Sequence, residues 1–370
     1  MNTDILIVGA GLSGATLAEH FARISNRKVL VIDKRDHIGG NVYDYIDEQT
    51  GIRVGKYGIH MFHTNDDGVW DYLQRFGEWK RFDHKVLSYV DHQFVPVPVN
   101  INTVNLLCNE SLQTEEDMKT WLDKHQVPCE HPQTSEDVAL ARVGKTLYER
   151  LFRPYTLKQW NKDPSELDAS VLARIPVRTN FDDRYFTDKF QSLPVDGYTS
   201  IVANMLNHPN ITVRLNTSWE DIKNIAQFSI LIFTGPIDQY FADRGLPPLE
   251  YRSLDFQWET HKLSGFYQPT SQVNYPGNDM PFTRIVEYKH LLNQSSDYTI
   301  ITKETSSDRG EPYYPVPNKK NQDLYEQYKQ LAESTPSVHF IGRLASYKYF
   351  NMDQAIRNAM DYFRYHFSTK

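Results

Sequence analysis

The sequence predicts an α/β fold in which a parallel-sheet domain carries an inserted small helical domain and an antiparallel β-sheet domain. Three observations lead to this prediction. The chain opens with an apolar run, a glycine turn and an amphipathic segment, which is the order of a β-α-β unit. Helical patterns dominate residues 104–173, and alternating apolar residues recur on both sides of them. A chain of 370 residues has room for several such units.

The composition narrows the classes of function. The chain carries 40 basic and 47 acidic side chains, a formal charge of −7, and no run of Lys or Arg, so we expect no nucleic-acid partner. Cys108 and Cys129 form no Cys-x-x-Cys pair, which suits a reducing compartment. The sequence shows neither a signal-peptide pattern nor an apolar stretch of membrane-spanning length. We therefore expect a cytoplasmic protein without membrane insertion.

The first elements form a Rossmann-like unit. Residues 4–8 predict a buried strand, residues 15–24 a helix and residues 28–33 a second strand. Strands that are joined through a helix lie parallel in one sheet. With a glycine turn between the first strand and the helix, this order indicates a nucleotide-binding domain.

The glycine turn itself carries a dinucleotide fingerprint. Gly9, Gly11 and Gly14 have the spacing Gly-x-Gly-x-x-Gly, which allows a tight turn, a close approach of the pyrophosphate and close packing of helix on strand. Asp33 ends the second strand, where its carboxylate can accept hydrogen bonds from a ribose. The pyrophosphate would lie on the helix N-terminus.

NAD uses the same fingerprint, so later segments must decide between NAD and FAD. Residues 34–41 contain a polar turn and a Gly-Gly pair that resemble the extended fingerprint of FAD enzymes of the glutathione-reductase and amine-oxidase type. Residues 230–236 and the segment from Gly342 to the helix near Met352 resemble later parts of these flavoproteins. That helix N-terminus would stabilise an anionic reduced flavin. We expect FAD.

The middle of the chain predicts a hairpin followed by helices. Residues 86–90 and 93–95 alternate like paired strands. Thr134 and Asp137 form a potential capping box, and Pro154 is predicted to end the helix that follows it.

The remaining elements return to strands and then to α/β character. Strands are expected at 211–215, 230–233, 282–287 and 298–303, the last two as an antiparallel pair. A helix at 321–333, a strand at 338–341 and a helix from about Met352 make the FAD domain discontinuous. The predicted domains are an FAD-binding domain (1–80, 193–234 and 316–370), a helical domain with a mobile lid (99–173) and a sheet domain (81–98, 174–192 and 235–315).

Several motif blocks, in chain order, resemble the UDP-galactopyranose mutase family. They span nearly the whole chain. The blocks are Lys56-Tyr-Gly58-Ile-His60-Met-Phe-His63, Tyr155-Thr156-x-x-Gln159-Trp160, Arg174-Ile-Pro-Val-Arg178, Thr283-Arg284-Ile285, Glu311-Pro-Tyr-Tyr314 and Gly342-Arg343-Leu-Ala-x-Tyr347-Lys-Tyr349.

The resemblance implies an isomerase that interconverts UDP-galactopyranose and UDP-galactofuranose for cell-surface polysaccharide. It implies that FAD must be reduced, and that N5 of the flavin is the nucleophile on the anomeric carbon while the chain supplies position and electrostatics. It also implies a homodimer. The alternatives are an FAD-dependent oxidoreductase of the amine-oxidase type, a mutase that also accepts UDP-N-acetylgalactosamine, and a flavoprotein used only for binding.

The same resemblance assigns residues to the diphosphate. Arg174 and Arg284 match two cationic phosphate ligands. Tyr185, Tyr314 and Tyr349 match hydroxyl donors to the same phosphates. Each of these side chains, taken alone, is as consistent with a salt bridge or with core packing.

The uridine end of the site is assigned to one short segment. Tyr155, Thr156 and Trp160 match its ligands, and Phe152 joins them. Leu151 stands where an aromatic residue is expected. Residues 161–173 would form the lid.

The flavin side is assigned to His60, His63 and Arg252, with His63 near N5 and the sugar. The spacing of the two histidines also suits a metal, but no third ligand is apparent, so we predict none. Asn351 stands where relatives carry Asp. The expected catalytic set is Arg174, Arg284, His63, Tyr314 and Tyr349. The expected cofactor contacts are Gly9, Gly11, Leu12, Ser13, Gly14, Asp33, Lys34, Arg35, Gly40, Asn41, His60, Arg252, Gly342, Arg343 and Met352.

Overall fold

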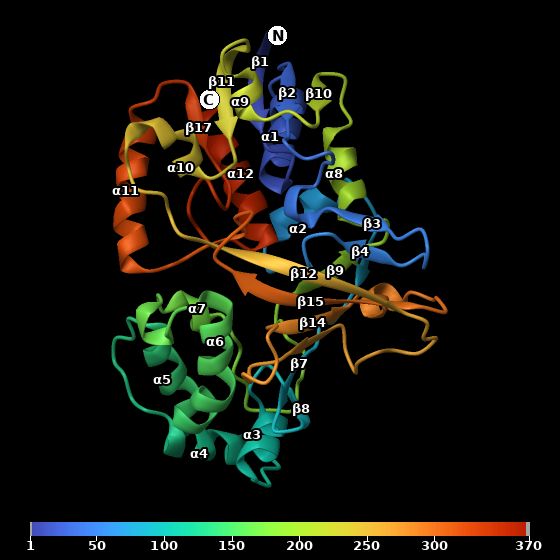
Figure 1. Ribbon diagram of the computed structural model, residues 1–370, viewed down its shortest axis with the longest axis vertical. Helices are drawn as coiled ribbons and strands as arrows, with labels where there is room; N and C mark the ends of the chain where they lie inside the picture. The colour runs from blue at the N-terminus through green and yellow to red at the C-terminus, as the bar shows by residue number, and fades with distance from the viewer. Residues whose placement is uncertain (1, 368–370) are drawn as a thin grey trace.

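The computed structural model describes residues 2–367 and has three regions (Figure 1). A parallel sheet with its helices lies at the top of the view, where both chain termini are found. A long, mostly antiparallel sheet crosses the middle, and a group of helices lies at the lower left. The predicted α/β fold class is confirmed.

The parallel sheet has five strands in the order β10-β2-β1-β11-β17, and all of its pairs are parallel. Side chains of β1 alternate between two cores: Ile5 and Ile7 pack with α1, α8 and α12, whereas Leu6 packs on the opposite face. The strands are β1 (Asn2–Val8), β2 (Val29–Ile32), β10 (Ile211–Arg214), β11 (Gln227–Phe233) and β17 (Val338–Phe340). The helices around it are α1 (Leu12–Arg23), α2 (Asp67–Gln74), α8 (Tyr198–Leu206), α9 (Trp219–Ile222), α10 (Ile237–Tyr240), α11 (Lys319–Glu333) and α12 (Met352–His366).

The second sheet has seven strands in the order β16-β12-β15-β14-β13-β7-β8. The predicted hairpin, β7 with β8, and the predicted pair, β14 with β15, are both confirmed. The longest strand, β12, was not predicted, because charged residues such as Asp255 and Glu259 interrupt its apolar pattern. Pairing of β13 with β7 is parallel, so the sheet is mixed. Its strands are β7 (Val86–Val90), β8 (Gln93–Pro96), β12 (Tyr251–His261), β13 (Gln272–Asn274), β14 (Arg284–Glu287), β15 (Thr299–Ser307) and β16 (Tyr314–Pro315).

The helical region differs from the prediction at one point. The capping box of Thr134 and Asp137 is confirmed, but Pro154 ends no helix. Pro154 lies in the first turn of α6, where its missing N–H leaves no hydrogen bond unmade. The break comes earlier, at Gly144, whose φ is 75°. The elements are α3 (Ile101–Cys108), α4 (Glu115–His125), α5 (Ser135–Leu147), the π-helix η2 (Tyr148–Phe152), α6 (Arg153–Trp160), η3 (Pro164–Glu166) and α7 (Ser170–Ala173).

Two small sheets connect the regions. One has three strands in the order β5-β9-β6, and the other pairs β3 with β4. The strands are β3 (Asp44–Ile46), β4 (Arg53–Gly55), β5 (Phe62–Thr64), β6 (Trp79–Arg81) and β9 (Phe190–Pro194), and the short helices are η1 (Gly40–Val42), η4 (Ala242–Arg244) and η5 (Tyr288–Asn293).

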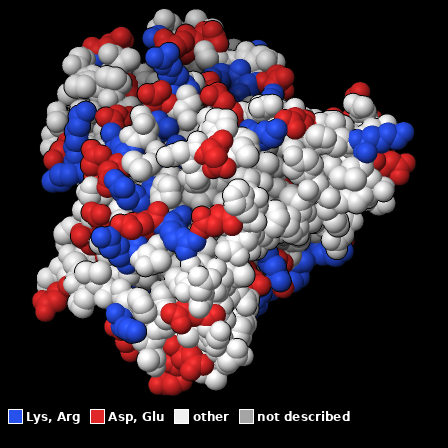
Figure 2. Space-filling model, turned by 60° about the horizontal axis from the view of Figure 1, so that its bottom comes forward, with Lys and Arg blue, Asp and Glu red and all other residues white. Residues whose placement is uncertain are grey.

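Charges are mixed on the surface. On the face in Figure 2, Lys and Arg side chains are interspersed with Asp and Glu. Among residues 2–367, no helix combines the length and the apolar character needed to cross a bilayer.

The kink in α5 generates a stability prediction. A Cβ at Gly144 would lie 2.2 Å from the carbonyl oxygen of His125, whereas a Cβ at Gly51 would have no neighbour within 4 Å, and both glycines have positive φ. We expect Gly51→Ala to lower the free energy of unfolding by about 1–2 kcal/mol, the cost of a left-handed alanine. Gly144→Ala should lower the free energy of unfolding by about 1–3 kcal/mol more than Gly51→Ala does, because the backbone must also shift. Urea unfolding of both variants measures the difference, and equal losses would contradict the predicted clash.

Candidate active site

A cavity of about 360 Å³ lies beyond the carboxyl ends of β1, β2 and β11. This is the usual ligand position in a parallel α/β sheet. All but one of the predicted cofactor contacts line it. They are Gly9, Gly11, Leu12, Ser13, Gly14, Asp33, Lys34, Arg35, Gly40, Asn41, His60, Gly342, Arg343 and Met352.

The glycines of the turn are required by its geometry. A Cβ at Gly9 would lie 2.0 Å from Thr234 Oγ1, and a Cβ at Gly14 would lie 2.0 Å from the Gly9 carbonyl oxygen. A Cβ at Gly40 would lie 2.9 Å from the Cα of Gly11. The backbone therefore closes tightly around the N-terminus of α1, where N–H groups attract an anion. These features fit the pyrophosphate of a dinucleotide.

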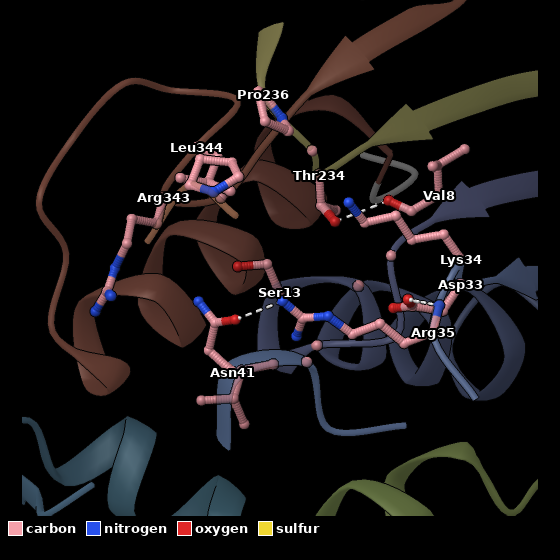
Figure 3. Close-up of a pocket in the computed structure, with 18 of the residues that line it drawn as sticks. Val8, Ser13, Asp33, Lys34, Arg35, Asn41, Thr234, Pro236, Arg343 and Leu344 are labelled. Carbon is pink, nitrogen blue, oxygen red and sulfur yellow. Dashed lines mark hydrogen bonds between the residues drawn. The ribbon is translucent and has the colours of Figure 1, made fainter. Parts of the chain in front are cut away.

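Asp33 is fixed at the mouth of the same cavity (Figure 3). Its carboxylate accepts hydrogen bonds from the backbone N–H of Ala10 at 2.8 Å and of Arg35 at 2.9 Å. A carboxylate has about four acceptor positions, so it retains capacity for ribose hydroxyls. The side chain of Arg35 is directed to Asn41 Oδ1, 3.0 Å away, and packs over the Tyr57 ring. This arrangement fits the adenosine half of a dinucleotide.

A second cavity, of about 270 Å³, opens between the helical region and the mixed sheet. His60, Arg343, Asn351 and Met352 line both cavities, so the two meet at the start of α12. Every predicted substrate contact lines the second cavity, as does His63. The substrate contacts are Phe152, Tyr155, Thr156, Trp160, Arg174, Tyr185, Arg284, Tyr314 and Tyr349.

Arg284 is held by a buried carboxylate. Its Nε and Nη2 each lie 2.7 Å from Oε2 of Glu304, which is fully buried on the neighbouring strand. Burial alone would lower the pKa of Arg284, but the attraction of Glu304 outweighs it, and the pKa is raised. Since only two donor groups are used, the others can face the cavity.

Arg174 is held differently. Its Nη2 donates to Asn351 Oδ1 at 3.0 Å, and its guanidinium lies 4.3 Å from the centre of the Tyr349 ring. Among the described residues no carboxylate forms an ion pair with Arg174 or with Arg343, whose guanidinium donates to the Phe350 carbonyl. Asn351 keeps the acceptor that Asp would offer without adding a negative charge. The cavity therefore has a positive potential suited to an anionic ligand.

Aromatic side chains surround these arginines. Tyr349 makes edge contacts with Tyr314, at 5.2 Å between ring centres, and with Trp160, at 5.9 Å. Burial raises the pKa of Tyr314 to about 12, so its hydroxyl is a hydrogen-bond donor at neutral pH. Burial likewise raises the pKa of Tyr185 and of Tyr155.

The histidines of the cavity are held in different ways. Burial and Arg343 lower the pKa of His60 to about 4, and its Nδ1 lies 3.1 Å from the Gly58 carbonyl oxygen. His63 pairs through Nδ1 with Asp188, at 3.0 Å. Residues 2–367 contain no cluster of three or more His, Cys, Asp or Glu that could hold a metal.

Arg252 is the one predicted cofactor contact that does not line the first cavity. Arg252 lines neither cavity; its Nε donates to the Gln159 carbonyl oxygen at 3.1 Å and to Ser306 Oγ at 3.2 Å. It lies on β12 and contacts the end of α6, so it joins the helical region to the mixed sheet, and its contact with a flavin stays a prediction.

Several residues of the second cavity were not predicted. His84, Phe186, Gln272 and Asn274 line it, and Asp188 lies behind His63. They come from a strand of only three residues and from irregular segments. No periodicity or motif marks such positions, and only the tertiary fold brings them together.

Comparisons with known proteins agree with this geometry. A family model described as UDP-galactopyranose mutase matches residues 150–349, and one described as an NAD(P)-binding Rossmann-like domain matches residues 7–76. A probable UDP-galactopyranose mutase of Klebsiella pneumoniae is 39% identical over 97% of this chain and 93% of its own length. A dTDP-fucopyranose mutase of Escherichia coli is 38% identical over 96% of each.

Solved structures show the same fold. The crystal structure of a reduced UDP-galactopyranose mutase aligns with a TM-score of 0.75 at 18% identity, over 100% of this chain and 96% of that one. A putative protoporphyrinogen oxidase from Exiguobacterium sp. aligns with a TM-score of 0.68 at 13% identity, over 98% of both.

The buried histidines generate a prediction about pH. Burial and the charges of Arg284 and His63 lower the pKa of His84 to about 3, and that of His60 is about 4, whereas histidine in an unfolded chain titrates near 6.5. The unfolded chain therefore binds more protons between these values. Stability is fully present above about pH 6.5 and is lost as the pH falls, by up to about 1.4 kcal/mol per pH unit for each group.

Urea unfolding between about pH 7 and 4.5 measures this slope. His84→Asn should reduce the slope of the unfolding free energy against pH by up to about 1.4 kcal/mol per pH unit. His131→Asn, on the surface, controls for the loss of a histidine. An unchanged slope in His84→Asn would contradict the predicted neutral state of His84.

Proposed function

This chain belongs to the UDP-galactopyranose mutase family, a family of flavin-dependent isomerases, and from that premise we propose that it interconverts UDP-galactopyranose and UDP-galactofuranose. One observation carries the proposal: a cavity with Arg174 and Arg284 meets a dinucleotide cavity at the start of α12. A nucleotide sugar placed with its diphosphate on the arginines would direct its sugar to that junction.

The cofactor of the proposal is FAD in its reduced form. The tight glycine turn and Asp33 support the adenosine and pyrophosphate half, and the junction lined by His60, Arg343 and Met352 supports the flavin ring. When bound, reduced FAD would supply the nucleophile, N5, for the anomeric carbon. The positive N-terminus of α12 would favour the anionic reduced state.

The chain's own part is to hold UDP while its bond to the sugar breaks and reforms. Arg174 and Arg284 would neutralise the diphosphate, and the hydroxyls of Tyr314, Tyr349 and Tyr185 would donate to it. Because Arg284 is fixed by Glu304, little reorganisation is needed when negative charge develops on the leaving phosphate.

The base would lie at the other end of the cavity. Phe152, Tyr155, Thr156 and Trp160 come from η2 and the adjoining α6, so one continuous helical segment presents them. Aromatic faces of Tyr155 or Trp160 would stack on the uracil. Residues 161–173 would form the lid, since Val171 and Leu172 line the cavity.

A second nucleotide sugar is supported by a specific observation. Identity to the dTDP-fucopyranose mutase is nearly the same as identity to the probable UDP-galactopyranose mutase, 38% against 39%. Val97, Val99 and Leu151 form an aliphatic wall in the cavity. Such side chains make favourable contacts with a thymine methyl group. We therefore propose dTDP-fucopyranose as an alternative substrate.

The proposal extends to a homodimeric enzyme of the cytoplasm that supplies galactofuranose for cell-surface polysaccharide. A reducing compartment is supported by Cys108 and Cys129, which are both free thiols.

Product analysis tests the proposed function. Holoenzyme reduced with dithionite is incubated separately with UDP-galactose, dTDP-fucose and UDP-N-acetylgalactosamine, and products are separated by chromatography and identified by mass and NMR. We expect furanose product from UDP-galactose with reduced enzyme and essentially none with oxidised enzyme. Turnover of dTDP-fucose alone would select the alternative substrate. Substrate-driven bleaching of oxidised flavin, without ring contraction, would instead indicate an oxidoreductase.

The arginines generate a further prediction. Arg174→Ala and Arg284→Ala should each lower kcat/KM at least 10- to 100-fold, because each removes a charge-assisted phosphate contact worth about 1.5–3 kcal/mol. The flavin absorbance of the purified variants should persist, since neither arginine lines the dinucleotide cavity. Arg81→Ala is the control, because Arg81 pairs with Asp83 on the surface. Near-normal turnover by either variant would remove that arginine from the site.

A further inference from the structure

The side chain of His63 is largely buried beside the second cavity. The residue lies on β5, at the centre of the three-residue strand, and lines the second cavity. Its ring stacks on Phe186 at 3.7 Å between ring centres, with the planes only 14° apart. The stacking contact with Phe186 and the pairing of β5 restrict the position of the imidazole ring. A flip of the ring, which exchanges its two edges, remains possible.

Asp188 removes that remaining freedom. One carboxylate oxygen, Oδ2, lies 3.0 Å from His63 Nδ1, and the other, Oδ1, accepts from Asn65 Nδ2 at 2.9 Å. Asn65 is fixed in turn, because its Oδ1 accepts from the backbone N–H of Lys189 at 2.8 Å. Asp188 lines neither the dinucleotide nor the substrate cavity. It therefore acts on the cavity through His63.

The pair decides which ring nitrogen carries the proton. An ionised carboxylate only accepts hydrogen bonds, so the nitrogen that faces it must donate. Nδ1 of His63 is therefore protonated, and in the neutral ring Nε2 carries the lone pair. Nε2 lies across the ring from Asp188, and no hydrogen bond from Nε2 to another described residue is found. This nitrogen is available to the cavity as an acceptor.

We infer that Asp188 is a positioning residue for the isomerisation: it fixes His63 so that Nε2 accepts a hydrogen bond from a hydroxyl of the sugar. The inference rests on the proposed function, because the sugar enters through it. A sugar hydroxyl needs an acceptor as well as donors, and the arginines and protonated tyrosines at the diphosphate supply donors. The hydroxyl of the next residue, Thr64, donates to Asp353 at the start of α12, which places His63 near the end of the helix at which the two cavities meet and the sugar is expected.

Substitution of Asp188 tests this role without removing the side chain from the loop. Asn in place of Asp offers one oxygen to two donors, Nδ1 of His63 and Nδ2 of Asn65, so the tautomer of His63 is no longer imposed. We expect Asp188→Asn to lower kcat 10- to 100-fold and to change KM and the Kd of UDP by less than twofold. The nucleotide contacts lie elsewhere in the cavity, so binding is retained.

A double-mutant cycle separates positioning from a structural role. If Asp188 acts through His63, adding Asp188→Asn to His63→Ala should change kcat by less than twofold. Multiplying effects in the double variant, or a parallel loss of UDP binding, would overturn the inference. Lys189→Ala is the matched control, because its side chain pairs with Asp67 on the surface next to Asp188. It should leave kcat unchanged.

A spectroscopic measurement makes the test independent of turnover. In histidine-labelled holoenzyme, the ¹⁵N shifts of His63, assigned by comparison with His63→Gln, should show a protonated Nδ1 and an unprotonated Nε2. Asp188→Ala should shift the population toward the other tautomer. A protonated Nε2 and bare Nδ1 in the wild type would overturn the inference. Absence of mutase turnover in the wild type would overturn the proposed function instead, while the NMR result would still decide the tautomer.

Discussion

The pairing of Arg284 with Glu304 is the interaction on which the rest of the site depends. The two residues stand directly opposite each other on β14 and β15, so the register of two neighbouring strands delivers the pair. A slip of one residue would turn Arg284 to the other face of the sheet. A buried guanidinium without a partner is costly, and a buried carboxylate is equally so. Each of the two charged side chains therefore offsets the cost of burying the other.

Around this fixed cation, the site is assembled from distant parts of the chain. The helical region contributes Phe152, Tyr155, Thr156 and Trp160 to the second cavity through η2 and α6. Arg252 and Ser306 donate to the Gln159 carbonyl oxygen at the end of α6. These contacts seat α6 on the sheet and place Trp160 against Tyr349. Arg252, which the resemblance assigns to the flavin, thus also joins two regions of the fold.

The arginines that line the two cavities differ in how far a neighbouring carboxylate neutralises their charge. Arg284 is partly neutralised by Glu304, whereas Arg174 and Arg343 bind only amide and carbonyl oxygens within the described residues. The neighbouring His60 and His84 are uncharged at neutral pH, since burial and nearby arginines lower their pKa. The positive charge is therefore concentrated on guanidinium groups. Guanidinium groups can bind a diphosphate through paired donors, which fits the proposed UDP ligand.

The β-α-β unit, its glycine turn and most helices were determined by local patterns in the sequence. Gly9 and Gly14 are required by the turn in which they lie, and the capping box of Thr134 follows from spacing alone. The residues of the second cavity that were predicted were recognisable only through motif blocks that resemble a family. Composition and periodicity could not identify them, because an arginine or a tyrosine is equally consistent with a core or a surface position.

Only the tertiary structure decided how these pieces meet. It showed the long β12, whose charged residues conceal its strand pattern, and it moved the helix break from Pro154 to Gly144. It joined Asp188 to His63 across 125 residues of sequence. Pairings of this kind depend on strand register and loop path, which arise from the packing of the whole chain. The sequence therefore shows which chemical groups this protein has. The fold determines which groups contact one another, and those contacts set the protonation and the orientation of each side chain.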